Sequence, residues 1–322
     1  MRSVTSCFNS TLYRKNLSRF WPIWALYSVI WLFALPLNLL TTIQRGQNWA
    51  LEDLAHSLDY FSRVSVGYSL NLGTVLAVIF GLLAAMAVFS YLDASRSACM
   101  MHALPLRREA LFFTNYLSGL SFLLLPNAAI FGLTLAGEAV GNCLDLKALA
   151  IWLLVQSASC LFFYSFAVFC AMFTGHVLAL PAFYVVLNGL AAGLCWVFSR
   201  MAEEFLFGFT SAAWLEKLGV WLTPVLLLSE ACHVQYDTIT DAAGNSMLGD
   251  PYFAGLGYAS LYALIGLVLA GLALQLLSNF LLTMIFTAFP ELMESYSQVL
   301  ENLGMYSPTV LSLLYTAAVA PL

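Results

Sequence analysis

The chain has 322 residues, of which 61% are hydrophobic and only 9% are charged, and its formal net charge at pH 7 is −5. A soluble domain carries about 25% charged residues, whereas this chain contains apolar runs of the roughly 20 residues that a helix needs to cross a bilayer. The composition therefore excludes an ordinary soluble domain, and the negative net charge argues against nucleic acid as a partner.

The first segment, 7–20, is polar and basic and reads CFNSTLYRKNLSRF. Its basic residues are Arg14, Lys15 and Arg19. One interpretation is an amphipathic helix in the membrane interface, with Leu12, Leu17 and Phe20 toward lipid and the basic residues at the headgroups. The other is a plain basic anchor ahead of the first span.

Six apolar segments follow and predict transmembrane helices at approximately 21–41, 69–91, 116–136, 149–172, 177–198 and 253–277. Backbone polar groups in lipid must be hydrogen-bonded within their own segment, which favours helices. The predicted fold is an all-α polytopic membrane protein with six transmembrane helices. An N-terminal interfacial helix precedes them, and a small external segment lies between spans five and six.

Basic residues predict the orientation of the spans through the positive-inside rule. Seven of the twelve lie in two stretches, and they are Arg2, Arg14, Lys15, Arg19, Arg96, Arg107 and Arg108. Both stretches are therefore predicted to be cytoplasmic, together with the N-terminus.

Two polar regions are predicted to lie outside: a loop at 42–68, and a small cap at 199–252 made of short helices and an irregular stretch rich in turn residues. The six-span domain is predicted to occupy 1–277, followed by a tail of uncertain placement at 278–322 that contains a possible truncated extra span. The apolar run 280–289 either extends the sixth span into one over-long helix or forms a re-entrant piece.

Within the spans, the polar residues predict interhelical hydrogen bonds and the small residues predict close helix packing. The polar residues are Asn127, Gln156, Asn188 and Gln275, and the small ones are Gly81, Ala84, Ala85, Gly266, Ala270 and Gly271. No acidic or basic residue lies firmly inside a predicted span, which argues against a proton-relay carrier.

Residue patterns for catalysis or metal binding are missing from the sequence. The three lysines are Lys15, Lys147 and Lys217, and none follows a glycine as a P-loop requires. The four histidines fall in different loops, so no metal site is predicted. No cofactor site or catalytic residue is predicted on this chain either. Glu203 and Glu204 resemble the glutamate pair of CAAX-type intramembrane proteases, but Gly208 stands where those proteases carry arginine, so we interpret the pair as a solvated outer face.

The loop between the second and third spans combines a proline with adjacent charges. Pro105 fits the first turn of a helix, which places Arg107 and Arg108 in that first turn. Positive charge there opposes the helix dipole, at a cost of about 0.3–1 kcal/mol for each arginine. Helix energetics therefore do not explain these arginines. They are either anchors on anionic lipid or part of a short helix that docks on an acidic partner, and the residues alone leave both interpretations open.

The stretch 91–119, YLDASRSACMMHALPLRREALFFTNYLSG, resembles the first cytoplasmic loop of bacterial ABC-2 type transporter permeases. The matching positions are Tyr91, Leu92, Ser95, Arg96, His102, Leu104, Pro105, Arg107, Arg108, Glu109, Asn115, Tyr116 and Leu117. The segment LYRKNLSRFWPIWALYSVIWLFALP near the N-terminus is similar to the opening of the same family.

This resemblance implies the permease subunit of an ATP-driven exporter in a bacterial plasma membrane. Such a subunit pairs with a second permease, as a homo- or heterodimer, and with separate ABC ATP-binding subunits. ATP and Mg²⁺ would then lie in the partner, and this chain is not expected to be an enzyme. The implied coupling-helix residues, which would bind the ATP-binding subunit, are Arg96, His102, Leu104, Pro105, Arg107, Arg108 and Glu109.

The sequence also departs from the family pattern, because the basic segment that usually follows the sixth span is replaced by LQLLSNFLLTMIF. An alternative hypothesis is a membrane-embedded sensor or scaffold that binds a peptide or envelope ligand through 199–252.

Overall fold

The structure is a computed structural model, and it describes residues 8–41, 54–91, 108–141, 146–174, 176, 178–205, 213–231, 234–240, 246–253 and 255–288. Six helical segments in this part of the chain are long and apolar enough to cross a membrane, which confirms a polytopic membrane protein with an all-α transmembrane fold. Their helices are α2 (Trp21–Leu32) continued by the π-helical turn η1 (Phe33–Leu37), α4 (Leu54–Phe89), α6 (Arg108–Gly141), α7 (Leu146–Phe173), α8 (Ala179–Phe205) and α11 (Gly255–Ala288).

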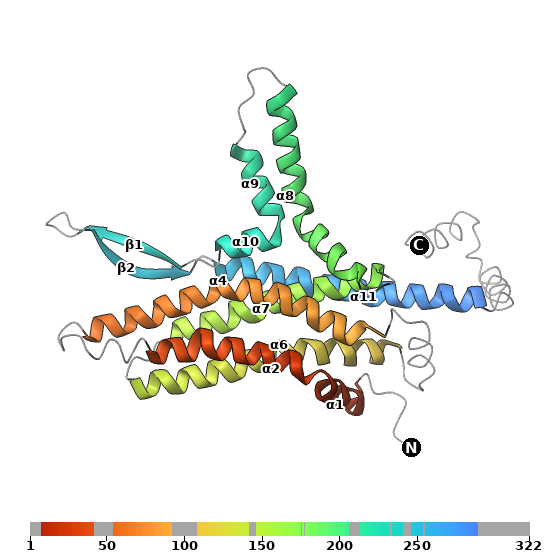
Figure 1. Ribbon diagram of the computed structural model, residues 1–322, viewed down its shortest axis with the longest axis horizontal. Coiled ribbons are helices and arrows are strands. Elements are labelled where there is room, and N and C mark those ends of the chain that lie inside the picture. The colour runs from red at the N-terminus through yellow and green to blue at the C-terminus, as the bar shows by residue number, and fades with distance from the viewer. Residues whose placement is uncertain are drawn as a thin grey trace, which may run out of the picture.

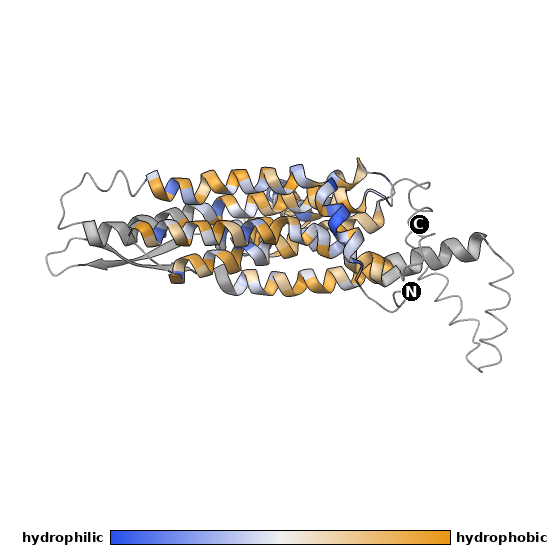
Figure 2. Ribbon diagram, turned by 90° about the horizontal axis from the view of Figure 1, so that it is seen from below, coloured by the Kyte–Doolittle hydropathy of each residue, from blue (hydrophilic) through white to orange (hydrophobic). Residues whose placement is uncertain are grey.

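Five of these helices, all except α8, run side by side with α7 among them, and their described residues are mostly hydrophobic (Figures 1 and 2). Helix α7 packs against α4, α11 and α6. Large side chains fill these contacts, and Phe162 on α7 lies edge-on to Tyr262 of α11 with ring centroids 4.9 Å apart. Trp152 on α7 also lies edge-on to Trp31 of α2, with ring centroids 5.0 Å apart. Because α7 contacts helices on several sides, its buried residues form the centre of the core.

Close helix packing occurs at two of the predicted glycines. A Cβ added at Gly266 on α11 would lie 2.9 Å from the Cα of Phe162, and one added at Gly81 on α4 would lie 3.0 Å from the backbone nitrogen of Tyr164. A Cβ at Gly271, by contrast, would meet nothing within 4 Å. The prediction is therefore confirmed for Gly81 and Gly266 but not for Gly271.

We expect Gly266→Leu to lower the free energy of unfolding by about 1–3 kcal/mol, because the new side chain would push α11 away from the backbone of α7. Gly271→Leu is the matched control on the same helix, and it should leave stability almost unchanged. Thermal unfolding of both variants in detergent measures the difference. Equal melting temperatures would show that α11 does not pack on α7 through Gly266.

Helix α8 differs from the other five because it bends partway along and rises away from the bundle (Figure 1). Near the bend, the N–H of Ala192 donates to the Thr223 hydroxyl, 3.1 Å away, and Gly189 and Gly193 lie on either side. A side chain that takes a helix N–H, next to glycines, is a recognised cause of a kink. The second half of α8 then packs against α9 (Ala213–Leu222) instead of the bundle.

Several helices extend further than the hydropathy pattern predicts. The pattern predicts an outer loop up to residue 68, but α4 is already helical from Leu54. Likewise α6 continues to Gly141 and includes Glu138, which is fully buried near the end of the third candidate span. At the other end of the chain α11 continues through residue 277 to Ala288, so the over-long helix is confirmed and the predicted domain boundary falls inside a helix.

The segment between α8 and α11 contains more regular structure than predicted. Its short helices are α9 and α10 (Pro224–Ala231), as expected. The stretch predicted to be irregular instead forms an antiparallel hairpin of β1 (Val234–Thr240) and β2 (Ser246–Phe253), with an irregularity in register between Tyr236 and Thr238. Alternating β-branched and aromatic residues in VQYDTIT favour a strand, and this pattern outweighs the turn residues nearby.

Candidate functional site

The predicted coupling residues lie mostly outside the part of the chain that the structure describes. This applies to Arg96, His102, Leu104, Pro105 and Arg107. Arg108 is the first residue of α6 and Glu109 follows it, but the side chains of both also lie outside the description. What the structure does describe is the base of the 92–107 segment, where Tyr91 follows α4 and α6 begins.

Aromatic rings connect the two ends of this segment to the core. We call them the aromatic cluster, and it comprises Phe89, Tyr91, Phe112, Tyr116 and Tyr164. Adjacent rings have centroids 6.3 Å apart for Phe89–Tyr91, 5.7 Å for Phe89–Phe112, 5.9 Å for Phe112–Tyr116 and 5.2 Å for Tyr116–Tyr164. Centroid separations of about 4.5–7 Å are those of stabilising aromatic pairs. The cluster therefore links the end of α4 and the start of α6 to α7.

Polar groups within the cluster are also paired. The hydroxyl of Tyr164 donates to the backbone carbonyl of Tyr116, 3.1 Å away, and the hydroxyl of Tyr116 lies 2.6 Å from that of Ser165. Gly119 faces the Tyr164 ring, and a Cβ there would collide with the hydroxyl oxygen. Glycine at position 119 thus allows the Tyr164 ring on α7 to reach the backbone of α6.

Tyr91 lies two residues beyond the end of the second candidate span, at Phe89, and is buried. Burial raises the pKa of Tyr91 to about 12, and the neighbouring Asn115 side chain offsets a smaller part of this rise. Tyr91 therefore stays neutral well into the alkaline range and acts as a packing group. Tyr91, Asn115 and Tyr116, three positions that carry the family resemblance, are thus neighbours in space.

An N-terminal helix, α1 (Ser10–Arg19), packs against α6 beside this cluster. The Asn16 amide donates to the Asn115 side-chain oxygen at 2.9 Å and to the Ser118 hydroxyl at 3.1 Å, and all three residues are buried. The Tyr13 hydroxyl donates to Ser121 at 3.0 Å. We call these contacts the α1–α6 clasp.

The clasp corrects one prediction about the N-terminal segment. The interfacial interpretation predicts that Leu17 and Phe20 face lipid, but both are partly buried against the hydrophobic core, and the Phe20 ring lies 6.2 Å from that of Phe122. The reason is Asn16, which lies on the same side of α1 and finds its hydrogen-bond partners on α6 rather than in lipid.

A second polar group, which we call the central polar group, lies deeper in the bundle and joins four helices. It comprises Tyr27 on α2, Gly73 on α4, Asn127 on α6, and Gln156 and Cys160 on α7. The Gln156 amide lies 3.2 Å from both the Tyr27 hydroxyl and the Gly73 carbonyl, and Tyr27 donates to Asn127 at 2.9 Å.

This geometry confirms interhelical hydrogen bonds for Asn127 and Gln156. It contradicts that prediction for the Asn188 amide, which donates to the Tyr184 carbonyl of its own helix. The side chain of Gln275 lies outside the description.

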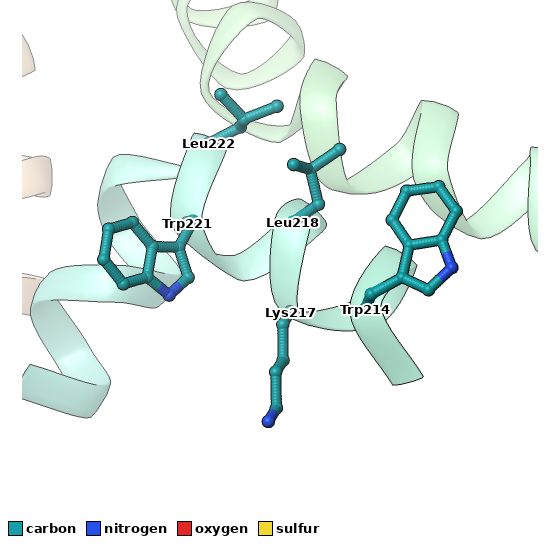
Figure 3. Close-up of a pocket in the computed structure, with 5 residues that line it drawn as sticks. All are labelled: Trp214, Lys217, Leu218, Trp221 and Leu222. Atoms are coloured by element: carbon teal, nitrogen blue, oxygen red, sulfur yellow. The ribbon is translucent and has the colours of Figure 1, made fainter. Parts of the chain in front are cut away.

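A hollow on the described surface lies on α9, far along the chain from the aromatic cluster. Figure 3 shows its lining, with the Lys217 side chain between the indoles of Trp214 and Trp221. Its volume is about 410 Å³, and Leu218 and Leu222 complete the lining. Because all its residues come from one helix, it is an open hollow that cannot enclose most of a ligand as typical binding pockets do.

Other chemistry in the described part of the chain is limited. No group of three or more His, Cys, Asp or Glu residues there could hold a metal ion. Glu203 forms an exposed ion pair with Arg200 at 3.3 Å, and Glu204 is exposed, as expected for a solvated face. Comparison with known proteins finds no matching family model, curated protein or solved structure.

Proposed function

We propose that this chain is the permease subunit of an ATP-driven ABC exporter in a bacterial plasma membrane, with a cytoplasmic N-terminus. In this proposal the 92–107 segment contacts a separate ATP-binding subunit, and a second permease subunit completes the transporter. ATP and Mg²⁺ bind to the partner, because the sequence has no P-loop lysine. The sequence motif around Pro105 suggests the docking residues.

The aromatic cluster is the structural observation that most strongly supports the proposal. A loop that receives force from a partner can move a bundle only if its ends are attached to the core. Here Tyr91 and the first turns of α6 are both joined through the aromatic rings to Tyr164 on α7. Helix α7 makes the most extensive helix–helix contacts in the described part of the chain, with α11 and α4. Displacement of the segment would therefore reach α4, α6 and α7 together, since packed interiors move as units.

We expect the double variant Arg107→Glu and Arg108→Glu to lose co-purification with the ATP-binding subunit and to lose stimulation of its ATP hydrolysis. Reversing two charges at a complementary interface replaces attraction with repulsion, which costs several kcal/mol. A matched control reverses Lys147 and Arg200, two exposed cations on helices α7 and α8. Unchanged association and stimulation in the Arg107/Arg108 variant would contradict the claim that these arginines dock on the ATP-binding subunit.

The alternative, a sensor or scaffold that binds through 199–252, is favoured only by the hollow on α9 and its exposed tryptophans. It predicts ligand binding that is lost on Trp214→Ala and Trp221→Ala, without any ATP-dependent flux. ATP-dependent flux in vesicles that contain this chain and its ATP-binding partner would exclude it.

A further inference from the structure

The side of α1 that faces away from α6 is strongly basic. Arg14, Lys15 and Arg19 are all exposed, and successive helical residues are about 100° apart, so the three cations fall on one half of the helix with Thr11 and Ser18 between them. We call this the basic face. No acidic residue precedes Glu52 in the chain, and no described carboxylate forms a salt bridge with the basic face.

The opposite side of α1 is already occupied. The α1–α6 clasp takes up Asn16 and Tyr13, and Leu17 and Phe20 pack against the core. Of the three residues that the interfacial interpretation placed toward lipid, only Leu12 is not packed against the core. The surface that α1 leaves to another molecule is therefore mainly its basic face.

Chain connectivity fixes the depth of the basic face in the membrane. Arg19 ends α1, and Trp21, two residues later, begins both α2 and the first candidate span. Trp21 is 59% exposed, and an exposed indole at the start of a span is typical of the headgroup level. The guanidinium of Arg19, which lies 5.2 Å above the Phe20 ring, is consequently at the level of lipid phosphates.

We propose that the basic face binds the phosphate groups of anionic phospholipids, and that the α1–α6 clasp holds it in place for this purpose. Lipid fits better than an acidic protein, because the exposed positions of α1 are Ser10, Thr11, Arg14, Lys15, Ser18 and Arg19. A protein interface needs an apolar, well-packed centre, and this face offers none. A headgroup layer requires only charge within a Debye length.

Lipid bound in this way would stabilise the region beside the aromatic cluster. Asn16 joins α1 to Asn115, and Asn115 neighbours Tyr91. A ligand that binds only the clasped state of α1 must increase the population of that state. The proposal goes beyond transport, since it concerns this chain alone.

The test measures thermal unfolding of the purified full chain in detergent micelles that contain increasing phosphatidylglycerol or, separately, phosphatidylcholine. We expect phosphatidylglycerol to raise the melting temperature in a salt-sensitive way, and phosphatidylcholine to have little effect. In the variant Arg14→Gln, Lys15→Gln and Arg19→Gln, the half-maximal effect should need at least about tenfold more phosphatidylglycerol, since each cation near an anionic surface contributes roughly fivefold in affinity.

Two further variants make the result specific. The variant Lys147→Gln, Arg200→Gln and Lys217→Gln removes the same charge from exposed positions elsewhere and should respond like the unaltered chain. The variant Arg14→Lys and Arg19→Lys keeps the charge and should also respond. An equal response of the basic-face variant and the unaltered chain would overturn the proposal.

A different outcome would assign the basic face to another partner. If neutralisation of the basic face left the phosphatidylglycerol response intact, and separate co-purification showed that it released the ATP-binding subunit, the face would be a protein contact and the lipid proposal would be wrong. The melting experiment contains no ATP-binding subunit, so its failure would leave the proposed transport function untouched.

Discussion

Tyr164→Ala is expected to lower the free energy of unfolding by about 3–5 kcal/mol, the range for removing a buried aromatic side chain. Tyr164 is fully buried, its ring lies 5.2 Å from that of Tyr116, and its hydroxyl donates to the Tyr116 carbonyl. The substitution leaves a cavity between α6 and α7 and removes the hydrogen bond from the Tyr164 hydroxyl to the Tyr116 carbonyl. Unfolding of the purified chain by heat or by a denaturing detergent measures the loss.

Two controls separate the ring from the hydroxyl and from the helix. Tyr164→Phe keeps the ring and should cost only about 1 kcal/mol, the net value of one hydrogen bond. Leu154→Ala changes a side chain on the same helix that is 59% exposed, and it should cost little. If Tyr164→Ala were as mild as Leu154→Ala, the aromatic cluster would not join α6 to α7.

Gln156→Leu is expected to cost about 2–3 kcal/mol, although leucine is the more apolar residue. The Gln156 amide lies within hydrogen-bonding distance of the Tyr27 hydroxyl, the Gly73 carbonyl and the Cys160 sulfur, and these groups would lose a donor inside the bundle. Interhelical hydrogen bonds contribute only about 0.6–2 kcal/mol each, but this one amide serves three acceptors, so their losses add.

Asn188→Leu is the matched control for this substitution. Asn188 is also a buried amide within a span, but its partner among the described residues is Tyr184 of its own helix. Its replacement should therefore change stability much less than Gln156→Leu. The melting temperatures of the two variants measure this difference. A larger loss for Asn188→Leu than for Gln156→Leu would show that the central polar group does not hold the four helices together.

The sequence predicts the spans well and the helix ends poorly, and both outcomes have one physical reason. Hydropathy detects the part of a helix that lies in hydrocarbon, whereas a helix ends where its backbone hydrogen bonds end. The polar turns of α4 from Leu54 and the end of α6 near Glu138 are helical but not apolar, so the pattern misses them. The β1–β2 hairpin could have been predicted from the alternation in VQYDTIT.

Some residues of the candidate site could likewise be predicted from the sequence, and others could not. Tyr91, Asn115 and Tyr116 could be singled out because they lie in one motif near the loop. Tyr164 and Asn16 could not, because each is far along the chain from its partner and helix periodicity does not specify which helices pack together. One signal for Asn16 was available, since it interrupts the apolar side of α1 formed by Leu17 and Phe20.

The central claim is that the 92–107 segment contacts an ATP-binding subunit, and site-specific photo-cross-linking tests it most directly. A photoreactive amino acid at His102 or Arg107 is introduced into the full chain, which is co-expressed with the ATP-binding subunit in the membrane. The same probe at Lys217, on α9, is the control. The account predicts covalent capture of the ATP-binding subunit from positions 102 and 107 and none from 217. Capture from 217 alone, or from none of the three positions, would contradict it.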